Sequence, residues 1–277
     1  MRRYEATFTL LTAESAKAID PFKISQLITE NLFRGGTGEE LKVASDGLRL
    51  YCDAPDKETM RVWAVKTAAR FAALISMKTG QYFSAIFRGL DSIPVESGQS
   101  ILAPFVNQWW VDSYKSERLR EDVAACGAAA QIQDNRFHKA CVYFRRGLFY
   151  RRVVWSLMHP LDPDGSFNAS EATLNFWKAV NVILGDEISG PMAQALGINR
   201  EMRQRIEQLY RRRKERDVAH PLPDASAVEE LRNALAFSQQ IAGEVIEKYA
   251  TFLQSGQRFN SAPILGPRRT RRSRGKG

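Results

Sequence analysis

A repeating pattern of apolar residues, beginning near Asp134 and ending at Gly256, constrains the fold more than any other feature of the sequence. Four successive segments carry apolar residues at steps of three, four or seven, a spacing that gathers them on one side of an α-helix. The first segment has this pattern at Phe137, Cys141, Phe144, Leu148, Trp155 and Met158. Amphipathic helices of this length, joined by short loops, pack as bundles. We therefore predict an all-α four-helix bundle over residues 131–254.

Turn and capping residues indicate where the first two helices begin and end. The sequence Asp162-Pro163-Asp164-Gly165 is typical of a turn and predicts the end of the first helix. The second helix is expected to begin at Asn168, with Glu171 three residues later as its capping-box partner. It runs through Leu174, Trp177 and Leu184 to Gly185.

The same signals delimit the third and fourth helices. The third is expected to start near Asn199, with the apolar residues Ile198, Met202, Ile206 and Leu209 aligned. The fourth follows Pro223 and has Ser226 and Glu229 as a second capping box. The fourth helix is expected to end before Gly256. The apolar residues on its one side are Val228, Leu231, Leu235, Ala242, Val245, Tyr249 and Phe252.

Residues 1–130 mix strand and helix signals, so we predict a small α+β domain there. Strands are indicated at residues 4–11, 48–52 and 82–87, which are rich in β-branched and aromatic residues. A helix over Lys57–Met77 carries one apolar stripe: Met60, Ala64, Ala68, Phe71 and Ile75. The glycine cluster at residues 35–38 is interpreted as a surface turn, and the Trp109-Trp110 pair as core.

The charge of the chain is concentrated at one end. Residues 255–277 hold seven basic side chains and no acid, which leaves a net charge of +2 on residues 1–254 out of the total of +9. A Gly-, Pro- and Arg-rich segment has too few apolar residues to fold, so we expect a disordered basic tail. This tail either binds nucleic acid through its positive charges or only increases solubility. The basic residues are Arg258, Arg268, Arg269, Arg271, Arg272, Arg274 and Lys276.

Composition narrows the class of protein. No apolar run approaches the roughly 18 residues that span a bilayer, and the start of the chain lacks a secretory apolar segment, so we expect a cytoplasmic protein that does not enter the membrane. The three cysteines, Cys52, Cys126 and Cys141, are far apart and include no CxxC pair, which favours buried thiols over disulfides or a zinc site.

The stretch from Tyr210 to His220 crowds five basic side chains and two acids together before Pro221. One interpretation is a plain helix end, because Lys, Arg and His are favoured where they meet the negative end of the helix dipole. The other is chemistry on a phosphate. An imidazole that titrates near neutrality and a guanidinium can supply the acid, the base and the positive charge that RNA cleavage at its own 2′-hydroxyl requires. The remaining histidines, His138 and His159, are interpreted as ordinary helix residues.

Three segments of the helical half resemble the HEPN superfamily of helical nucleotide-binding and ribonuclease domains. They are residues 143–148 (YFRRGL), residues 176–180 (FWKAV) with Leu184-Gly185-Asp186, and Leu209-Tyr210 leading to Arg216-Asp217-Val218-Ala219-His220-Pro221. The resemblance implies metal-independent RNA cleavage, without a cofactor, by an arginine and a histidine, assisted by the polar residue after the arginine. Residues 1–130 resemble no family that we can name.

In this chain the arginine of that motif is displaced. Glu215 stands five positions before His220, where the family usually has the arginine. Arg216 has three residues between itself and His220, and Arg213 has six. The expected catalytic residues are therefore His220 as general acid and base, Arg213 or Arg216 on the scissile phosphate, and Asp217 as the polar helper. Further contacts to nucleic acid are expected from the basic residues around the motif and in the tail: Arg211, Arg212, Lys214, Arg268, Arg269, Arg271, Arg272, Arg274 and Lys276.

The sequence thus predicts an RNA-directed protein, with an endoribonuclease of a toxin, antiviral-defence or RNA-processing system as the favoured function. RNA and a second copy of the chain are the expected partners, and a protein that inhibits or activates the nuclease is a further possibility. The alternative is a catalytically silent HEPN-like module for dimerisation and for binding nucleotide, RNA or protein. A bundle of purely structural use with a solubilising tail is the weakest interpretation.

Overall fold

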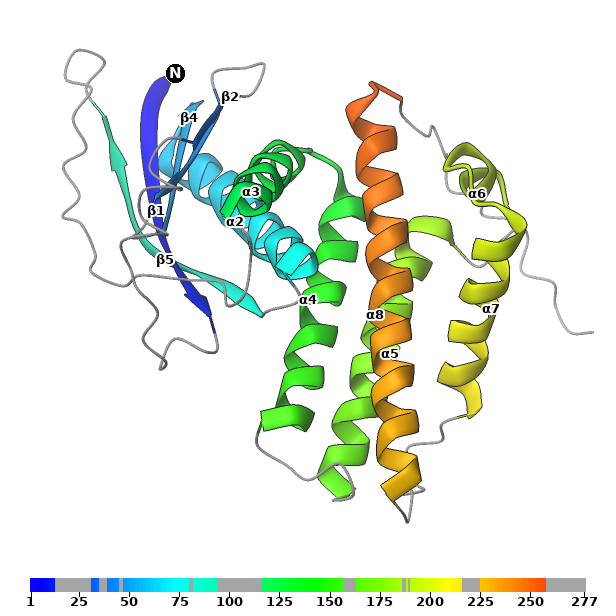
Figure 1. The fold of residues 1–277 in the computed structure, drawn as a ribbon. Helices are drawn as coiled ribbons and strands as arrows, with labels where there is room; N and C mark the ends of the chain where they lie inside the picture. Colours follow the sequence, from blue (N-terminus) through cyan, green and yellow to red (C-terminus); the bar gives the residue numbers. More distant parts are fainter. Residues whose placement is uncertain are drawn as a thin grey trace, which may run out of the picture.

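The computed structural model describes residues 1–12, 31–34, 39–44, 47–79, 82–93, 116–156, 163–185, 188, 190–215 and 225–257. Within these ranges the chain forms an antiparallel sheet followed by a mostly helical half. Figure 1 shows helices α2 and α3 lying against one face of the sheet, with α4, α5, α7 and α8 side by side beyond them. An α+β composition is therefore confirmed. None of the described helices is long and apolar enough to cross a membrane.

The sheet has five strands in the order β2-β3-β4-β1-β5, and every neighbouring pair is antiparallel. The strands are β1 Arg2–Thr12, β2 Asn31–Arg34, β3 Glu40–Ala44, β4 Gly47–Ala54 and β5 Phe83–Ser92. Because side chains alternate along a strand, Tyr4, Ala6, Phe8 and Leu10 of β1 all point to the helical side and are buried. The strands predicted at residues 4–11, 48–52 and 82–87 are confirmed as β1, β4 and β5.

Helix α2, Lys57–Thr79, connects the sheet to the bundle. It starts where the side chain of Asp56 accepts a 2.7 Å hydrogen bond from the backbone N–H of Thr59, an N-cap contact that lowers the pKa of the Asp56 carboxyl. Its predicted apolar stripe, Met60, Ala64, Ala68, Phe71 and Ile75, is entirely buried.

Helix α3, Ser116–Ala130, packs beside α2 and is fixed to it by a buried arginine. Arg70 of α2 is 1% exposed and donates from Nε to the backbone carbonyl of Ala130, at 2.6 Å, and from Nη2 to Thr67 Oγ1, at 3.0 Å. The Ala130 carbonyl has no partner within its own helix, so the guanidinium satisfies a group that helix ends leave open. Burial of the charge lowers the pKa of Arg70 to about 10.

The helical half consists of α4 Asn135–Ser156, α5 Pro163–Leu184, α6 Pro191–Ala195, α7 Arg200–Glu215 and α8 Ala225–Gln254. The four long helices, α4, α5, α7 and α8, lie where the sequence pattern predicted helices. Gly185 follows α5 and Gly256 follows α8, both in the left-handed conformation, with φ of 76° and 77°. The predicted start of the second helix at Asn168 is wrong. The helix begins at Pro163, because proline is well suited to the first helical position and the Pro-Asp-Gly sequence is accommodated inside the first turn.

The sheet, α2 and the bundle share one continuous apolar core that runs from Tyr4 to Ala250. At the seam, Met77 of α2 packs against Gly243 of α8, and Lys78 Nζ lies 2.5 Å from Glu247 Oε1. Cys126 and Cys141 are buried, as predicted, whereas Cys52 is only half-buried. The glycine cluster at residues 35–38 and the Trp109-Trp110 pair lie outside the described residues.

Candidate functional site

The basic phrase that suggested a site begins on α7, and the start of this helix is well defined. Asn199 Oδ1 accepts a hydrogen bond from the backbone N–H of Met202, at 2.8 Å, which caps the helix where the sequence predicted. Met202, Ile206 and Leu209 are buried, so the predicted apolar stripe faces the bundle.

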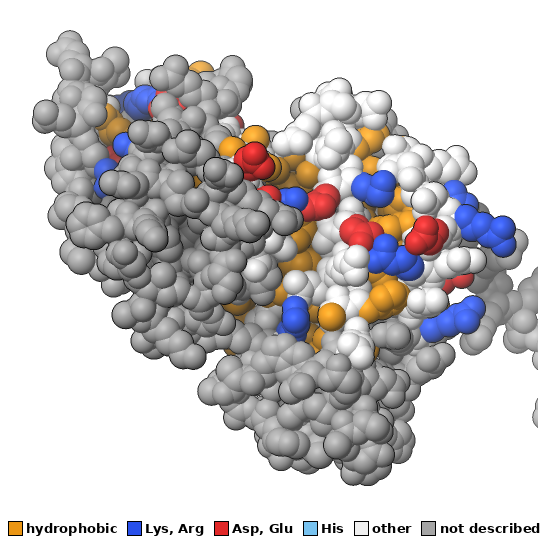
Figure 2. All heavy atoms as spheres, viewed as in Figure 1, with side chains coloured by type: hydrophobic (Ala, Val, Ile, Leu, Met, Phe, Trp, Pro, Cys, Tyr) orange, Lys and Arg blue, Asp and Glu red, His pale blue; other side chains and the backbone are white. Residues whose placement is uncertain are grey.

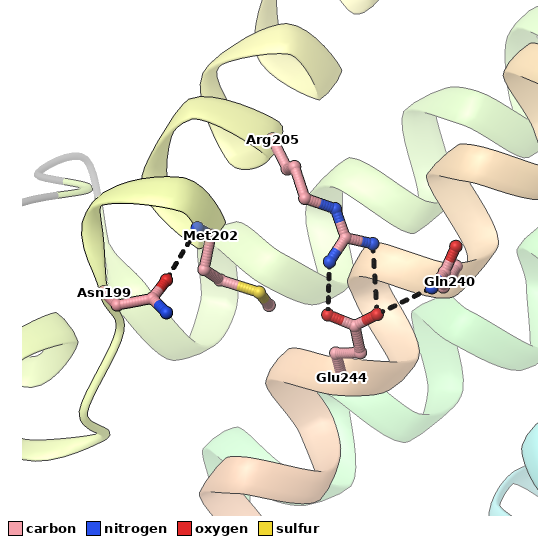
Figure 3. A network of polar contacts seen from close by, with 5 residues as sticks. All are labelled: Asn199, Met202, Arg205, Gln240 and Glu244. Atoms are coloured by element: carbon pink, nitrogen blue, oxygen red, sulfur yellow. Dashed lines mark hydrogen bonds and ion pairs between the residues drawn. The ribbon is translucent and has the colours of Figure 1, made fainter.

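A bidentate ion pair attaches α7 to α8 (Figure 3). Arg205 donates from Nη1 to Glu244 Oε2, at 2.8 Å, and from Nη2 to Glu244 Oε1, at 3.0 Å. Gln240 Nε2 also donates to Glu244 Oε1, at 2.9 Å, so the carboxylate is held from two helices. A two-pronged contact of this kind fixes rotation as well as distance between the helices.

Aromatic contacts complete the attachment of α7 and involve the same residues that suggested the HEPN resemblance. The ring of Tyr210 lies 5.1 Å from that of Trp177 on α5, measured between centroids, and Phe176 lies 5.4 Å from Phe144 on α4. A Cβ at Gly147 of α4 would stand only 2.6 Å from Phe176 Cε1, so this glycine lets the two helices approach closely. The described parts of the three segments are therefore linked through these contacts, which pack α4, α5 and α7 together.

The predicted catalytic residues lie where α7 ends and beyond it. Arg211 is exposed on α7, and Arg212, Arg213 and Lys214 belong to its last turn, for which the structure describes the backbone alone. Arg216, Asp217 and His220 lie outside the described residues, in the segment that joins α7 to α8. The basic tail residues Arg268, Arg269, Arg271, Arg272, Arg274 and Lys276 also lie outside them. The structure therefore fixes the helix that leads into the motif and leaves the motif geometry a prediction.

The described surface over α7 and α8 carries both signs of charge. Figure 2 shows basic and acidic side chains next to one another there, with apolar side chains between them. The Arg205–Glu244 pair is one such neighbouring set. Opposite charges on this face therefore partly offset one another. The stretch from Tyr210 to His220, by contrast, holds five basic side chains and two acids.

A second basic element is α4, a helix that its apolar pattern predicted but whose basic residues the sequence did not mark as a site. This helix carries Arg136, Lys139, Arg145, Arg146, Arg151 and Arg152 and no acidic residue. Arg151 donates from Nη1 to Gln239 Oε1 of α8, and burial lowers its pKa. The signal that could have revealed this helix is an acid-free run between Asp134 and Asp162.

His138 lies on the same helix, in an unusual environment for a histidine. Burial, followed by the charges of Arg70, Lys66 and Arg145, lowers the pKa of His138 to about 4, so the imidazole is neutral at physiological pH. Its buried Nδ1 has no hydrogen-bond partner in the described part of the chain. Among those same residues, no three His, Cys, Asp or Glu side chains gather closely enough to hold a metal ion.

Comparison of the chain with protein families, with curated proteins and with solved structures finds no match in any of the three. The functional argument therefore depends on the residues of this chain alone.

Proposed function

We propose that the chain is an RNA-directed protein of the HEPN-like kind and cleaves RNA without a metal ion, in a toxin, antiviral-defence or RNA-processing system. In this mechanism His220 is the general acid and base, Arg213 or Arg216 neutralises the scissile phosphate, and Asp217 assists. The observation that carries the proposal is that the motif follows directly on α7, a helix held by a bidentate ion pair to α8 and an aromatic contact to α5.

This attachment matters because catalysis by an arginine and a histidine depends on position. Arg213 comes three residues after Tyr210, whose ring contacts Trp177, so the last turn of α7 continues from a section that cannot rotate freely. A pre-positioned guanidinium stabilises the charge that develops on the phosphorane without having to be ordered during the reaction.

The chemistry follows from the side chains proposed. An imidazole takes the proton of the 2′-hydroxyl, which then attacks the adjacent phosphorus, and the 5′-oxygen leaves with a proton. The products are a 2′,3′-cyclic phosphate and a free 5′-hydroxyl. DNA lacks the nucleophile and should not be cleaved by this route.

The experiment is cleavage of a labelled RNA in the presence of EDTA, with the product ends identified by mass spectrometry. His220→Ala should abolish cleavage while RNA affinity is retained, since the loss falls on the transition state rather than on ground-state contacts. His159→Ala, prepared in the same way, is the matched control and should cleave normally. Arg213→Ala and Arg216→Ala should differ, and the larger loss identifies the phosphate ligand.

Undiminished cleavage by His220→Ala would contradict the mechanism. Binding of RNA without any cleavage by the unmodified protein would instead favour the second function, a silent HEPN-like module. The sequence feature that favours this second function is Glu215, which occupies the position usual for the arginine.

A further inference from the structure

Helix α4 is a strongly basic element that has no acidic residues to balance it. Its 22 residues include six Lys and Arg side chains and no Asp or Glu. Arg136 and Lys139 lie three residues apart, a spacing at which like charges on a helix repel one another. At two other helix contacts of the described structure a basic side chain pairs with a carboxylate, Lys78 with Glu247 and Arg205 with Glu244.

The basic side chains of α4 that point away from the core gather on one face. The buried positions of the helix are Phe137, Ala140, Cys141, Phe144, Gly147 and Leu148. On the opposite side Lys139 and Arg146 are exposed and Arg145 is half-buried, and none of the three makes an ion pair with a described residue. Helix α2 packs against α4, and its half-buried Lys66 adds a fourth positive charge. Burial, followed by charges that include those of Lys66 and Arg145, lowers the pKa of His138.

An exposed aromatic cluster lies on the same face. Phe149 is 46% exposed, and it is the one aromatic side chain of the described residues that falls in the exposed class. Its ring lies 5.8 Å from that of Tyr82, just before β5, and 5.6 Å from that of Tyr150. Phe149 follows Arg145 and Arg146 by four and three residues, so the ring and the guanidinium groups are neighbours on the helix surface.

We propose that the outward face of α4, formed by Lys139, Arg145, Arg146 and Phe149 with Lys66 and Tyr82 beside it, is a binding surface for single-stranded RNA. The choice of RNA rests on the proposed function. The surface includes no residue of the His220 motif, and its proposal does not depend on catalysis.

The residue types fit this ligand in two ways. Lysine and arginine neutralise phosphates along a strand. An exposed ring that is held in place by two other aromatic side chains can stack on an unpaired base, whatever its identity. From Lys139 to Phe149 the surface extends about 15 Å along the helix axis, so it contacts a short run of nucleotides. A double helix, whose bases are already stacked on each other, cannot use the ring.

The test is fluorescence anisotropy with the full chain and an unstructured RNA of about 12 nucleotides, within the range of known single-strand sites. The RNA carries 2′-O-methyl groups, which prevent cleavage through the 2′-hydroxyl. Phe149→Leu keeps an apolar side chain without a ring and should weaken binding about tenfold, whereas Phe149→Tyr keeps the ring and should bind normally. Arg146→Gln should lower the slope of log affinity against log salt by about 0.7, and Lys248→Gln, an exposed residue of α8, should leave it unchanged.

The outcomes separate this surface from the proposed nuclease. Equal affinities of Phe149→Leu and the unmodified protein, or no measurable RNA binding at all, would overturn the surface even if RNA is cleaved. An equal loss on an RNA duplex of the same length would also overturn it, because the ring would not then be acting on unpaired bases. A selective loss on the single strand supports the surface even if no cleavage is found, in which case only the nuclease is rejected.

A second measurement uses His138, whose pKa is lowered by burial and by the positive charges of Arg70 and Lys66 of α2 and of Arg145 on its own helix. Phosphates bound at this face would offset those positive charges, so the pKa of His138 should rise when the methylated RNA is added. The chain has three histidines, so their ring protons can be followed individually by NMR with His138→Gln for assignment. An unchanged pKa of His138 at saturating RNA would contradict binding at this face.

Discussion

At the scale of single residues, Gly147 decides how closely α4 and α5 can pack. An added Cβ would lie 2.6 Å from Cε1 and 2.8 Å from Cδ1 of Phe176, a fully buried ring that also contacts Phe144. The ring has no room to move, so the helices must shift apart. We expect Gly147→Ala to lower the free energy of unfolding by about 1–3 kcal/mol, as overpacking of a core usually does. Urea unfolding monitored by circular dichroism measures the change.

Gly243→Ala in α8 is the control for this substitution. Both glycines lie inside helices, so both substitutions gain about 1 kcal/mol of helix propensity. The added methyl at position 243 would meet Met77 Cγ and Sδ at 3.3 Å, and a methionine side chain can turn aside. The Gly243 variant should therefore be as stable as the unmodified protein or slightly more stable. If the Gly147 variant is equally stable, the close approach does not constrain the bundle.

His138 gives the protein a pH dependence of known direction. Its pKa is about 4 in the folded chain and 6.5 when unperturbed, because of burial and three neighbouring positive charges. Between these values the unfolded chain binds a proton that the folded chain does not, so the free energy of unfolding falls as the pH is lowered from about 6.5 toward 4. His138→Gln should flatten the dependence of stability on pH in this window. An identical pH profile for the two proteins would contradict the neutral, buried imidazole.

Some residue roles could be predicted from sequence and others could not. The buried stripe of α2 and the stripe of α7 follow from local periodicity, which any helix with one buried side must show. Arg205 and Glu244 are 39 positions apart, and no local pattern indicates that they pair. Arg70 was equally hidden, because its partner is the backbone carbonyl of Ala130, 60 positions later.

At the scale of elements, helices with strong local signals were predicted and elements that depend on distant contacts were missed. Asn199 caps α7 and Gly256 terminates α8 through backbone and side-chain chemistry that the sequence displays directly. Strands β2 and β3 have only four and five residues, and they are defined by pairing, β2 with β3 and β3 with β4. Helix α3 ends against Arg70 of α2, and α6 has only five residues. Neither carries a long apolar repeat of its own.

In the candidate site too, features with local sequence signals were predicted, and features that depend on distant contacts were not. The sequence predicted the helix that leads into the basic phrase. It also predicted the start of α8 near Ala225, because both features depend on local signals. The apolar pattern at Phe137, Cys141, Phe144 and Leu148 did predict which side of α4 is buried, and that side is buried. No local pattern indicates that the exposed ring of Phe149 lies beside Tyr82, 67 positions earlier in the chain.

At the scale of the whole molecule, the boundary predicted near residue 130 crosses a packed region. Helix α2 belongs to the predicted N-terminal domain, yet it contacts α4, and its Lys78 pairs with Glu247 of α8. The apolar core is continuous across this contact. Whether the two parts fold independently therefore depends on two contributions to stability. One is the contact of the bundle with α2, and the other is the packing among α4, α5, α7 and α8.

A fragment of residues 131–254 tests this balance. The four long helices retain their own ring contacts and the Arg205–Glu244 pair, so we expect circular dichroism to show a helical, cooperatively unfolding fragment. Losing α2 exposes apolar surface around Gly243 and Phe144, and each buried Å² contributes about 25 cal/mol, so the fragment should unfold at a lower urea concentration than the full chain. Sedimentation should show a dimer if the predicted self-association belongs to the bundle. A fragment that is unfolded in buffer would reject the boundary near residue 130, and a folded monomer would reject only the dimer.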